Sequence, residues 1–273
     1  MKIYFLSTEI DPFSKTSSIS SFSKEFSSIV NNEKQYDIRL VQPKYNYISD
    51  RRFILREVIR LRDLEIEVAD FKEKVNLRSG FIPGTKVQVY FMEHESYFDV
   101  SELIYKSKNG RLYNNNHEKF SFFSYAALDT LKKLFWIPDV LIYNNWQTSL
   151  SPIISDTFFK ENLSQTKKVF IVHSIDELYS FDQSVYSKFD LVKMNSNNLL
   201  NAINSSDLTI FLNNESNEIS DLIKNEKDLS KTLKKCNHKI IDYSSDMDAS
   251  ERIEIYNNLI KEITNIKKWL KFF

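Results

Sequence analysis

Three short polar segments of the sequence carry side chains that could bind a ligand or take part in catalysis. They are residues 15–18 (Lys-Thr-Ser-Ser), residues 144–148 (Asn-Asn-Trp-Gln-Thr) and residues 173–174 (His-Ser). A lysine beside the start of a helix suits a phosphate or a hydroxyl-rich ligand. Amide side chains next to an indole suit the hydroxyls and the apolar face of a sugar. Together these residue types predict a phosphorylated or hydroxyl-rich ligand.

Each of these residues also has an ordinary structural explanation. Lys15 could be a solvated loop lysine, and Asn144 and Asn145 could be turn residues. Trp146 could lie in the core, and His173 could be a structural hydrogen-bonding group instead of a catalytic one. The convergence of all three segments on one edge of a sheet would therefore be stronger evidence than any single residue.

Each segment comes after a stretch that has the apolar pattern of a buried strand. These strands are predicted at residues 2–7, 139–143 and 168–172, and the first is followed by a polar loop up to residue 21. In a parallel sheet covered by helices on both faces, ligands bind beyond the carboxyl ends of the strands. The three segments are therefore expected at the same edge of the sheet.

Strands and amphipathic helices alternate along most of the chain, which is typical of a doubly wound α/β sheet. Residues 56–61, 64–75 and 86–92 interrupt this order with a β-rich insertion. We therefore predict a single Rossmann-like domain over residues 1–273, whose mainly parallel sheet is completed by residues 216–273. The other predicted strands are 37–42, 208–212 and 239–243, the helices are 18–32, 118–135, 149–159, 195–204, 215–235 and 248–270, and a turn is predicted at 82–84.

The composition excludes several classes of function. Only 3 of the 273 residues are glycine, so the chain has neither a glycine-rich dinucleotide-binding turn nor a P-loop, and a dinucleotide oxidoreductase is nearly excluded. The 37 basic residues balance the 37 acidic ones, which argues against nucleic-acid binding. Cys236 is the single cysteine and the 4 histidines lack metal-ligand spacing, so we expect no disulfide and no metal. We recognise no signal peptide or membrane segment and expect a cytoplasmic protein.

Several short motifs, taken in order, resemble the N-terminal half of bacterial glycogen and starch synthases. The family pattern S-x-E-x-x-P-x-x-K-T-G-G-L-x-D begins at Ser7 and includes Glu9, Lys15 and Thr16. The collinear likeness covers about residues 1–215 and is strong in aggregate, although each motif alone is weak. The other matches are residues 41–45 at V-x-P-x-Y, 113–120 at Y-x-D-N-x-E-R-F, 136–140 at W-x-P-D-I, 144–148 at H-D-W-Q-T and 172–174 within T-I-H-N.

The resemblance implies a GT-B fold, in which two Rossmann-like domains enclose the active site between them. It implies transfer of glucose from ADP-glucose or UDP-glucose to an α-1,4-glucan, with no metal and no cofactor beyond the nucleotide-sugar donor. The family's second domain carries most donor-binding groups and has no counterpart in this sequence, so a partner protein would have to supply them. The implied catalytic residue is His173, and the implied substrate-binding residues are Lys15, Thr16, Tyr113, Asn144, Asn145 and Trp146.

The sequence departs from the family pattern at positions that matter for chemistry. Ser17 and Ser18 stand where the family has paired glycines, and Asn115 stands where it has aspartate. The H-D pair of the family is replaced by Asn144 and Asn145. A change from aspartate to asparagine removes a charge and any function as a base. These departures leave a second hypothesis open, a non-catalytic module that binds a glucan, a nucleotide sugar or a protein.

Overall fold

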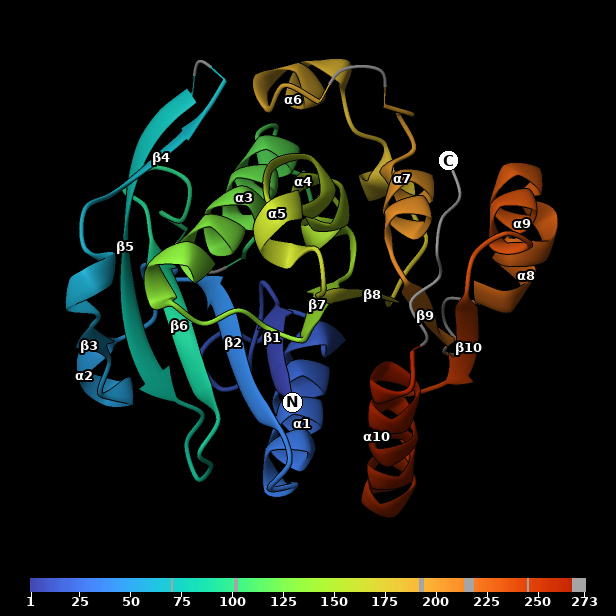
Figure 1. The fold of residues 1–273 in the computed structure, drawn as a ribbon, viewed down its shortest axis with the longest axis horizontal. Helices are drawn as coiled ribbons and strands as arrows, with labels where there is room; N and C mark the ends of the chain where they lie inside the picture. Colours follow the sequence, from blue (N-terminus) through green and yellow to red (C-terminus); the bar gives the residue numbers. More distant parts are fainter. Residues whose placement is uncertain (70, 101–102, 192–193, 214–218, 245, 267–273) are drawn as a thin grey trace.

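A computed structural model of the chain contains one large sheet covered by helices on both faces (Figure 1). The structure describes residues 1–69, 71–100, 103–191, 194–213, 219–244 and 246–266. The strand order across the sheet is β10-β9-β8-β7-β1-β2-β6-β5-β3, and β4 pairs with β5. The predicted α/β class with a mainly parallel sheet is therefore confirmed.

The central strands run parallel from β10 to β6, and their side chains form most of the core. β1, β7 and β8 are apolar and buried almost along their whole length, as expected for strands that are covered on both faces. These strands are β1 (Lys2–Leu6), β2 (Asp37–Pro43), β6 (Gln88–Glu93), β7 (Val140–Asn144), β8 (Lys167–Val172), β9 (Leu208–Asn213) and β10 (His238–Asp242).

The β-rich insertion extends the sheet with antiparallel strands. The strand predicted over residues 56–61 is only partly correct, because β3 covers Arg56–Glu57 and a 3₁₀ turn follows at Ile59–Leu61. The stretch 64–75 contains β4 (Leu64–Val68) and the start of β5 (Phe71–Phe81), which pair with each other. The predicted turn at 82–84 joins β5 to β6, and Gly84 adopts a φ of 79° there.

The helices form two layers, one on each face of the sheet (Figure 1). Helix α1 packs against α10 on one face, while α3, α4 and α7 contact one another in sequence on the other. The change of face follows from right-handed crossovers, since the chain moves one way from β1 to β6 and the opposite way from β7 to β10. The longer helices are α1 (Ser18–Asn32), α3 (Asn116–Leu134), α4 (Ser151–Phe158), α7 (Asn198–Ser205) and α10 (Ala249–Thr264).

Shorter helices fill the connections between these elements. They are α2 (Asp50–Phe53), α5 (Lys160–Leu163), α6 (Gln183–Lys188), α8 (Ile219–Asn225) and α9 (Lys227–Leu233), with 3₁₀ turns at Trp146–Thr148 and Glu177–Tyr179. The predicted helix 215–235 consists of α8 and α9, and its first residues lie outside the described chain. The predicted last helix ends at Thr264, and residues 267–270 of that prediction are likewise not described.

Helix α10 is tied to α1 through Glu25. Arg252 Nε donates to Glu25 Oε2 at 2.9 Å, and the Tyr256 hydroxyl donates to the same oxygen at 3.0 Å. The ring of Phe22 contacts the rings of Tyr243 and Tyr256. The segment after the last strand therefore closes against the first helix of the chain. None of the described helices combines the length and apolar character needed to cross a membrane.

Candidate functional site

The strand order reverses direction between β1 and β7, and this switch point is where an open α/β sheet binds ligands. The ends of β1, β7 and β8 meet here. Asn144 Nδ2 donates to Ser7 Oγ at 3.2 Å, and Asn144 Oδ1 lies 2.7 Å from His173 Nε2. We call Ser7, Asn144, Asn145 and His173 the switch-point cluster. The structure therefore brings the ends of three predicted strands together as expected, while the role of these residues in binding stays a prediction.

His173 is buried within this cluster. Its ring meets the ring of Phe22 edge to face at 5.0 Å, and burial lowers the pKa of the imidazole to about 3. The imidazole is therefore neutral at pH 7. An amide oxygen can only accept a hydrogen bond, so Nε2 carries the proton that is donated to Asn144 Oδ1 and Nδ1 is the acceptor nitrogen. In this form His173 suits hydrogen bonding to a substrate hydroxyl better than proton donation.

Asn145 is held in a backbone conformation that non-glycine residues rarely adopt, with a φ of 60° and a ψ of −170°. Such a conformation costs about 1–3 kcal/mol and persists only where the surroundings enforce it. Asn145 Oδ1 accepts hydrogen bonds from His173 N at 3.0 Å, Ser174 N at 3.3 Å and the Tyr179 hydroxyl at 3.2 Å. The side chain thus fixes the loop after β8 to the end of β7.

Trp146 is buried, with 2% of its surface exposed. Its ring packs edge to face against Phe120 at 5.2 Å, Tyr105 at 5.8 Å and His117 at 6.0 Å. The indole therefore has no open face on which a sugar could stack unless these neighbours move. The predicted part of Trp146 in shaping a sugar site stays a prediction.

The loop that leads into α1 is held by a carboxylate of the chain itself. Buried Glu9 accepts hydrogen bonds from Thr16 N at 2.6 Å, from Ser17 N at 2.9 Å and from Ser17 Oγ at 2.9 Å. A phosphate bound at this helix start would lie beside that carboxylate, and its binding there stays a prediction. Lys15 is exposed and makes no ion pair with any residue that the structure describes, so it is the group left there for an anion.

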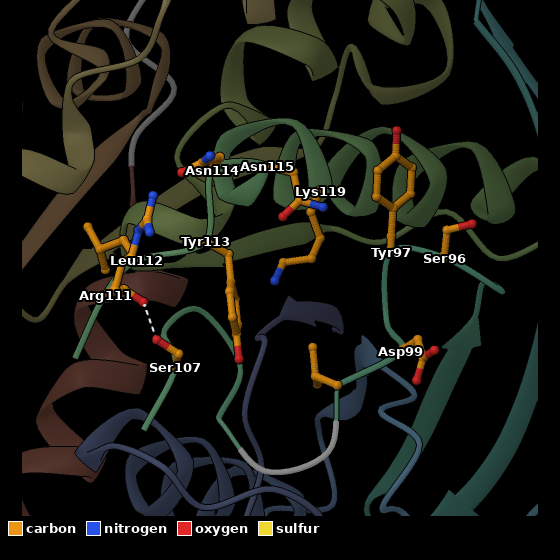
Figure 2. A pocket seen from close by; sticks show the side chains of 11 residues that line it. Ser96, Tyr97, Asp99, Ser107, Arg111, Leu112, Tyr113, Asn114, Asn115 and Lys119 are labelled. Atoms are coloured by element: carbon orange, nitrogen blue, oxygen red, sulfur yellow. Dashed lines mark hydrogen bonds between the residues drawn. The ribbon is translucent and has the colours of Figure 1, made fainter. Parts of the chain in front are cut away.

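Tyr113 contacts Tyr105 rather than the switch-point cluster itself, and its backbone N donates to Tyr105 O at 3.1 Å. It lines a cavity of about 520 Å³ that is formed by residues 96, 97, 99, 100, 107 and 111–115 together with Lys119 of α3 (Figure 2). We call this space the α3 cavity. No hydrogen bond or ring contact between described residues joins Tyr113 directly to Asn144, Asn145 or His173. The predicted site residues thus fall into three groups: the switch-point cluster with Trp146 beneath it, the start of α1, and the α3 cavity.

Sequence reasoning missed four residues that shape these places. Glu9 fits the family motif, but only the fold shows that its carboxylate caps the loop of Thr16 and Ser17. Tyr105 contacts the ring of Trp146, and the Tyr179 hydroxyl donates to Asn145 Oδ1. No local sequence pattern indicates these tertiary contacts. Lys119 occupies a motif position where a buried cation could have been suspected, because the family pattern has arginine there. Nowhere in the described ranges do three or more His, Cys, Asp or Glu side chains gather as a metal site would require.

Three comparisons relate the chain to known proteins. The family model described as the starch synthase catalytic domain matches residues 2–226. A glycogen synthase from Chlorobium limicola is 33% identical over 176 residues, which are 64% of this chain and 36% of that protein. A glycogen synthase from Chlorobaculum parvum is 33% identical over 178 residues, again 36% of its length. The chain therefore spans about a third of these curated relatives.

Among solved structures, the catalytic domain of starch synthase IV from Arabidopsis thaliana, bound to ADP and acarbose, has a similar fold. The TM-score is 0.66 at 16% sequence identity, and the match covers 88% of this chain and 51% of that chain. At this identity the likeness establishes the fold and no more.

Proposed function

Because the chain belongs to the starch synthase catalytic domain family, we propose that it forms one half of a glucosyl-transferring enzyme. The donor is ADP-glucose or UDP-glucose, and the acceptor is an α-1,4-glucan. The observation that supports this most strongly is the switch-point cluster, which places polar side chains at the sheet edge where the fold binds ligands.

The neutral His173 would hydrogen-bond a hydroxyl of the transferred glucose. Its Nε2 donates to Asn144, and in this neutral form Nδ1 is the ring nitrogen that can accept a hydrogen bond. Asn145 would act as a positioning residue, because it fixes the backbone of His173 and Ser174. The cluster is uncharged, which suits recognition of hydroxyl groups rather than of phosphates.

The phosphates of the donor need positively charged groups, and among the described residues few such groups lie near the switch-point cluster. Glu9 accepts hydrogen bonds from the two backbone amides just before α1, and the exposed Lys15 beside them is the cation that would contact a phosphate. A nucleoside diphosphate carries more negative charge than one exposed lysine can balance. We therefore propose that a second protein supplies the remaining donor-binding groups as the other half of a GT-B pair.

A complementation assay tests this function. Purified chain is mixed with the separately expressed part of the Chlorobium limicola glycogen synthase that the chain does not match, and transfer of radiolabelled glucose from ADP-glucose or UDP-glucose to glycogen is measured. We expect transfer in the mixture and none in either component alone. His173→Ala should reduce the rate about 100-fold or more, whereas His238→Ala, a change on the far edge strand β10, should leave it unaltered. No transfer with this or any other candidate second half would contradict the proposal.

A non-catalytic binding module is the second candidate function. The observation that favours it is the uncharged pair Asn144 and Asn145, which stands where the family pattern has H-D, so neither side chain of this pair can act as a base. Calorimetry with maltooligosaccharides and with ADP-glucose separates the two candidates. Binding that is lost in His173→Ala, with no turnover in any mixture, would favour the module over the enzyme.

A further inference from the structure

The α3 cavity has the size and lining of a small-molecule site. Its volume of about 520 Å³ lies within the range of ligand pockets in proteins. Hydroxyl and amide groups of Ser96, Ser107, Asn114 and Asn115 line it, together with the ring of Tyr113 (Figure 2). Such groups can pair with the hydroxyls of a sugar, and the aromatic ring offers an apolar face.

A buried lysine lies at the centre of this lining. Lys119 has 1% of its surface exposed, and Figure 2 shows its side chain descending from α3 toward the ring of Tyr113. Its Nζ donates to Ile104 O at 2.6 Å and lies 5.3 Å from the centroid of the Tyr113 ring. No carboxylate of the described residues forms an ion pair with it. A buried ammonium without a counter-ion is costly, so the cavity favours an incoming anion.

With the other charged groups of the described lining included, the cavity keeps a net positive charge. Arg111 lines the cavity and is exposed. Asp99 is the acidic residue in the lining, and its carboxylate accepts a hydrogen bond from Asn46 Nδ2. Tyr97 is also in the lining, but its hydroxyl donates to Glu118 at 2.6 Å. Among the described residues of the lining, Lys119 and Arg111 together therefore exceed the carboxylate of Asp99 by one charge.

We propose that the α3 cavity binds a sugar phosphate, with the phosphate against Lys119 and Arg111 and the sugar hydroxyls against the amide and hydroxyl side chains. This inference depends neither on which protein supplies the second GT-B domain nor on whether glucose is transferred. It concerns a ligand that binds the isolated chain, so its failure and the failure of the proposed transfer can be told apart.

Titration calorimetry of the isolated chain tests the site with four probes: glucose 1-phosphate, glucose 6-phosphate, inorganic phosphate and glucose. We expect at least one of the sugar phosphates to bind, and to bind about tenfold or more tightly than inorganic phosphate or glucose. Lys119→Met should weaken this binding about tenfold or more. The exposed Arg111→Gln should weaken it several-fold without affecting the fold, and Lys160→Met, a matched removal of a charge on α5, should not weaken it.

The coupling between binding and protonation gives a second readout. Burial lowers the pKa of Lys119 to about 8, so at pH 8 about half of the amine is neutral in the free protein. A bound dianion raises that pKa, and calorimetry in two buffers with different ionisation enthalpies should detect proton uptake. Lys119→Arg keeps the charge at every pH, so it should bind the sugar phosphate without the uptake. A merely structural lysine would not produce this difference.

Two results would overturn the proposal. One is that neither sugar phosphate binds the folded wild-type chain, or that inorganic phosphate or glucose binds equally well. The other is that binding is unchanged in both Lys119→Met and Arg111→Gln. If Lys119→Met fails to fold, as circular dichroism would reveal, Arg111→Gln and the proton uptake lost in Lys119→Arg still decide the question.

Discussion

The switch-point cluster and the α3 cavity differ in how their buried polar groups are satisfied. In the cluster, the amides of Asn144 and Asn145 and the imidazole of His173 are neutral and hydrogen-bonded to one another or to the backbone. In the cavity, Lys119 carries a charge that no described carboxylate balances. The hydrogen bonds of the cluster thus fix the positions of its side chains. In the cavity, by contrast, the ammonium of Lys119 lacks a described counter-ion.

The largest expected effect on stability comes from removing the side-chain oxygen of Asn145 in the cluster. Asn145→Ala leaves three donors without their acceptor and keeps the unfavourable φ, so it should lower the free energy of unfolding by about 3 kcal/mol or more. Asn145→Asp presents the same oxygen to His173 N, Ser174 N and the Tyr179 hydroxyl, so it should stay within about 1 kcal/mol of wild type. Urea denaturation measures both. Equal losses in the two variants would show that the cluster does not depend on this oxygen.

The next effect is a pH dependence that belongs to the cluster. The pKa of His173 is about 3 in the folded state and has its ordinary value near 6.5 in the unfolded chain. Between these values only the unfolded state binds the proton, so stability should fall as the pH drops from 6.5 toward 3, by up to about 1.4 kcal/mol per pH unit. His173→Gln cannot titrate and should show a correspondingly shallower loss between pH 6.5 and pH 4.5. Parallel curves for the two proteins would contradict the buried neutral imidazole.

A smaller effect of the same sign should appear for the cavity in a different pH window. Lys119 binds its proton less tightly in the folded state, with a pKa of about 8 against an ordinary value of 10.5. Stability should therefore rise from pH 8 to pH 10.5 in wild type relative to Lys119→Met, by about 1 kcal/mol per pH unit. Adding the sugar phosphate should reduce this rise, because the anion raises the pKa of the amine. The measurement is urea denaturation at several pH values with and without ligand.

The convergence of loops at the switch point could be predicted from two things: the apolar pattern of buried strands, and the rule that ligands bind beyond the carboxyl ends of parallel strands. Buried strands end just before Ser7, Asn145 and His173, and parallel strands present those ends at one edge. The structure of the β-rich insertion was harder to predict, because polar and apolar residues alternate over 56–61 as they would in a strand. The chain instead turns after β3, where Leu61 N donates to Val58 O, and leaves Ile59 80% exposed. Tertiary context overrode the local pattern there.

The details that decide chemistry could not be predicted from local patterns. Nothing in the sequence around Asn145 indicates a φ of 60°, because that strain is maintained by donors from a loop almost 30 residues away. Glu9 and the start of α1 were both visible, but their hydrogen bonds depend on how the loop between them folds. A substitution of aspartate by asparagine looked like a loss of function. At Asn145 the remaining oxygen still makes the three contacts described above.

The contact between α1 and α10 sets a condition on how the chain is made. Glu25 and its partners Arg252 and Tyr256 are separated by 227 and 231 residues. At a synthesis rate of roughly 5–20 residues per second, the ribosome needs about 10 to 45 s between making the two ends of this contact. During that time the aromatic face of α1, with Phe22 and Phe26, waits without its cover. The nascent chain therefore passes through a stage in which a chaperone can recognise α1, and that stage ends when α10 leaves the exit tunnel.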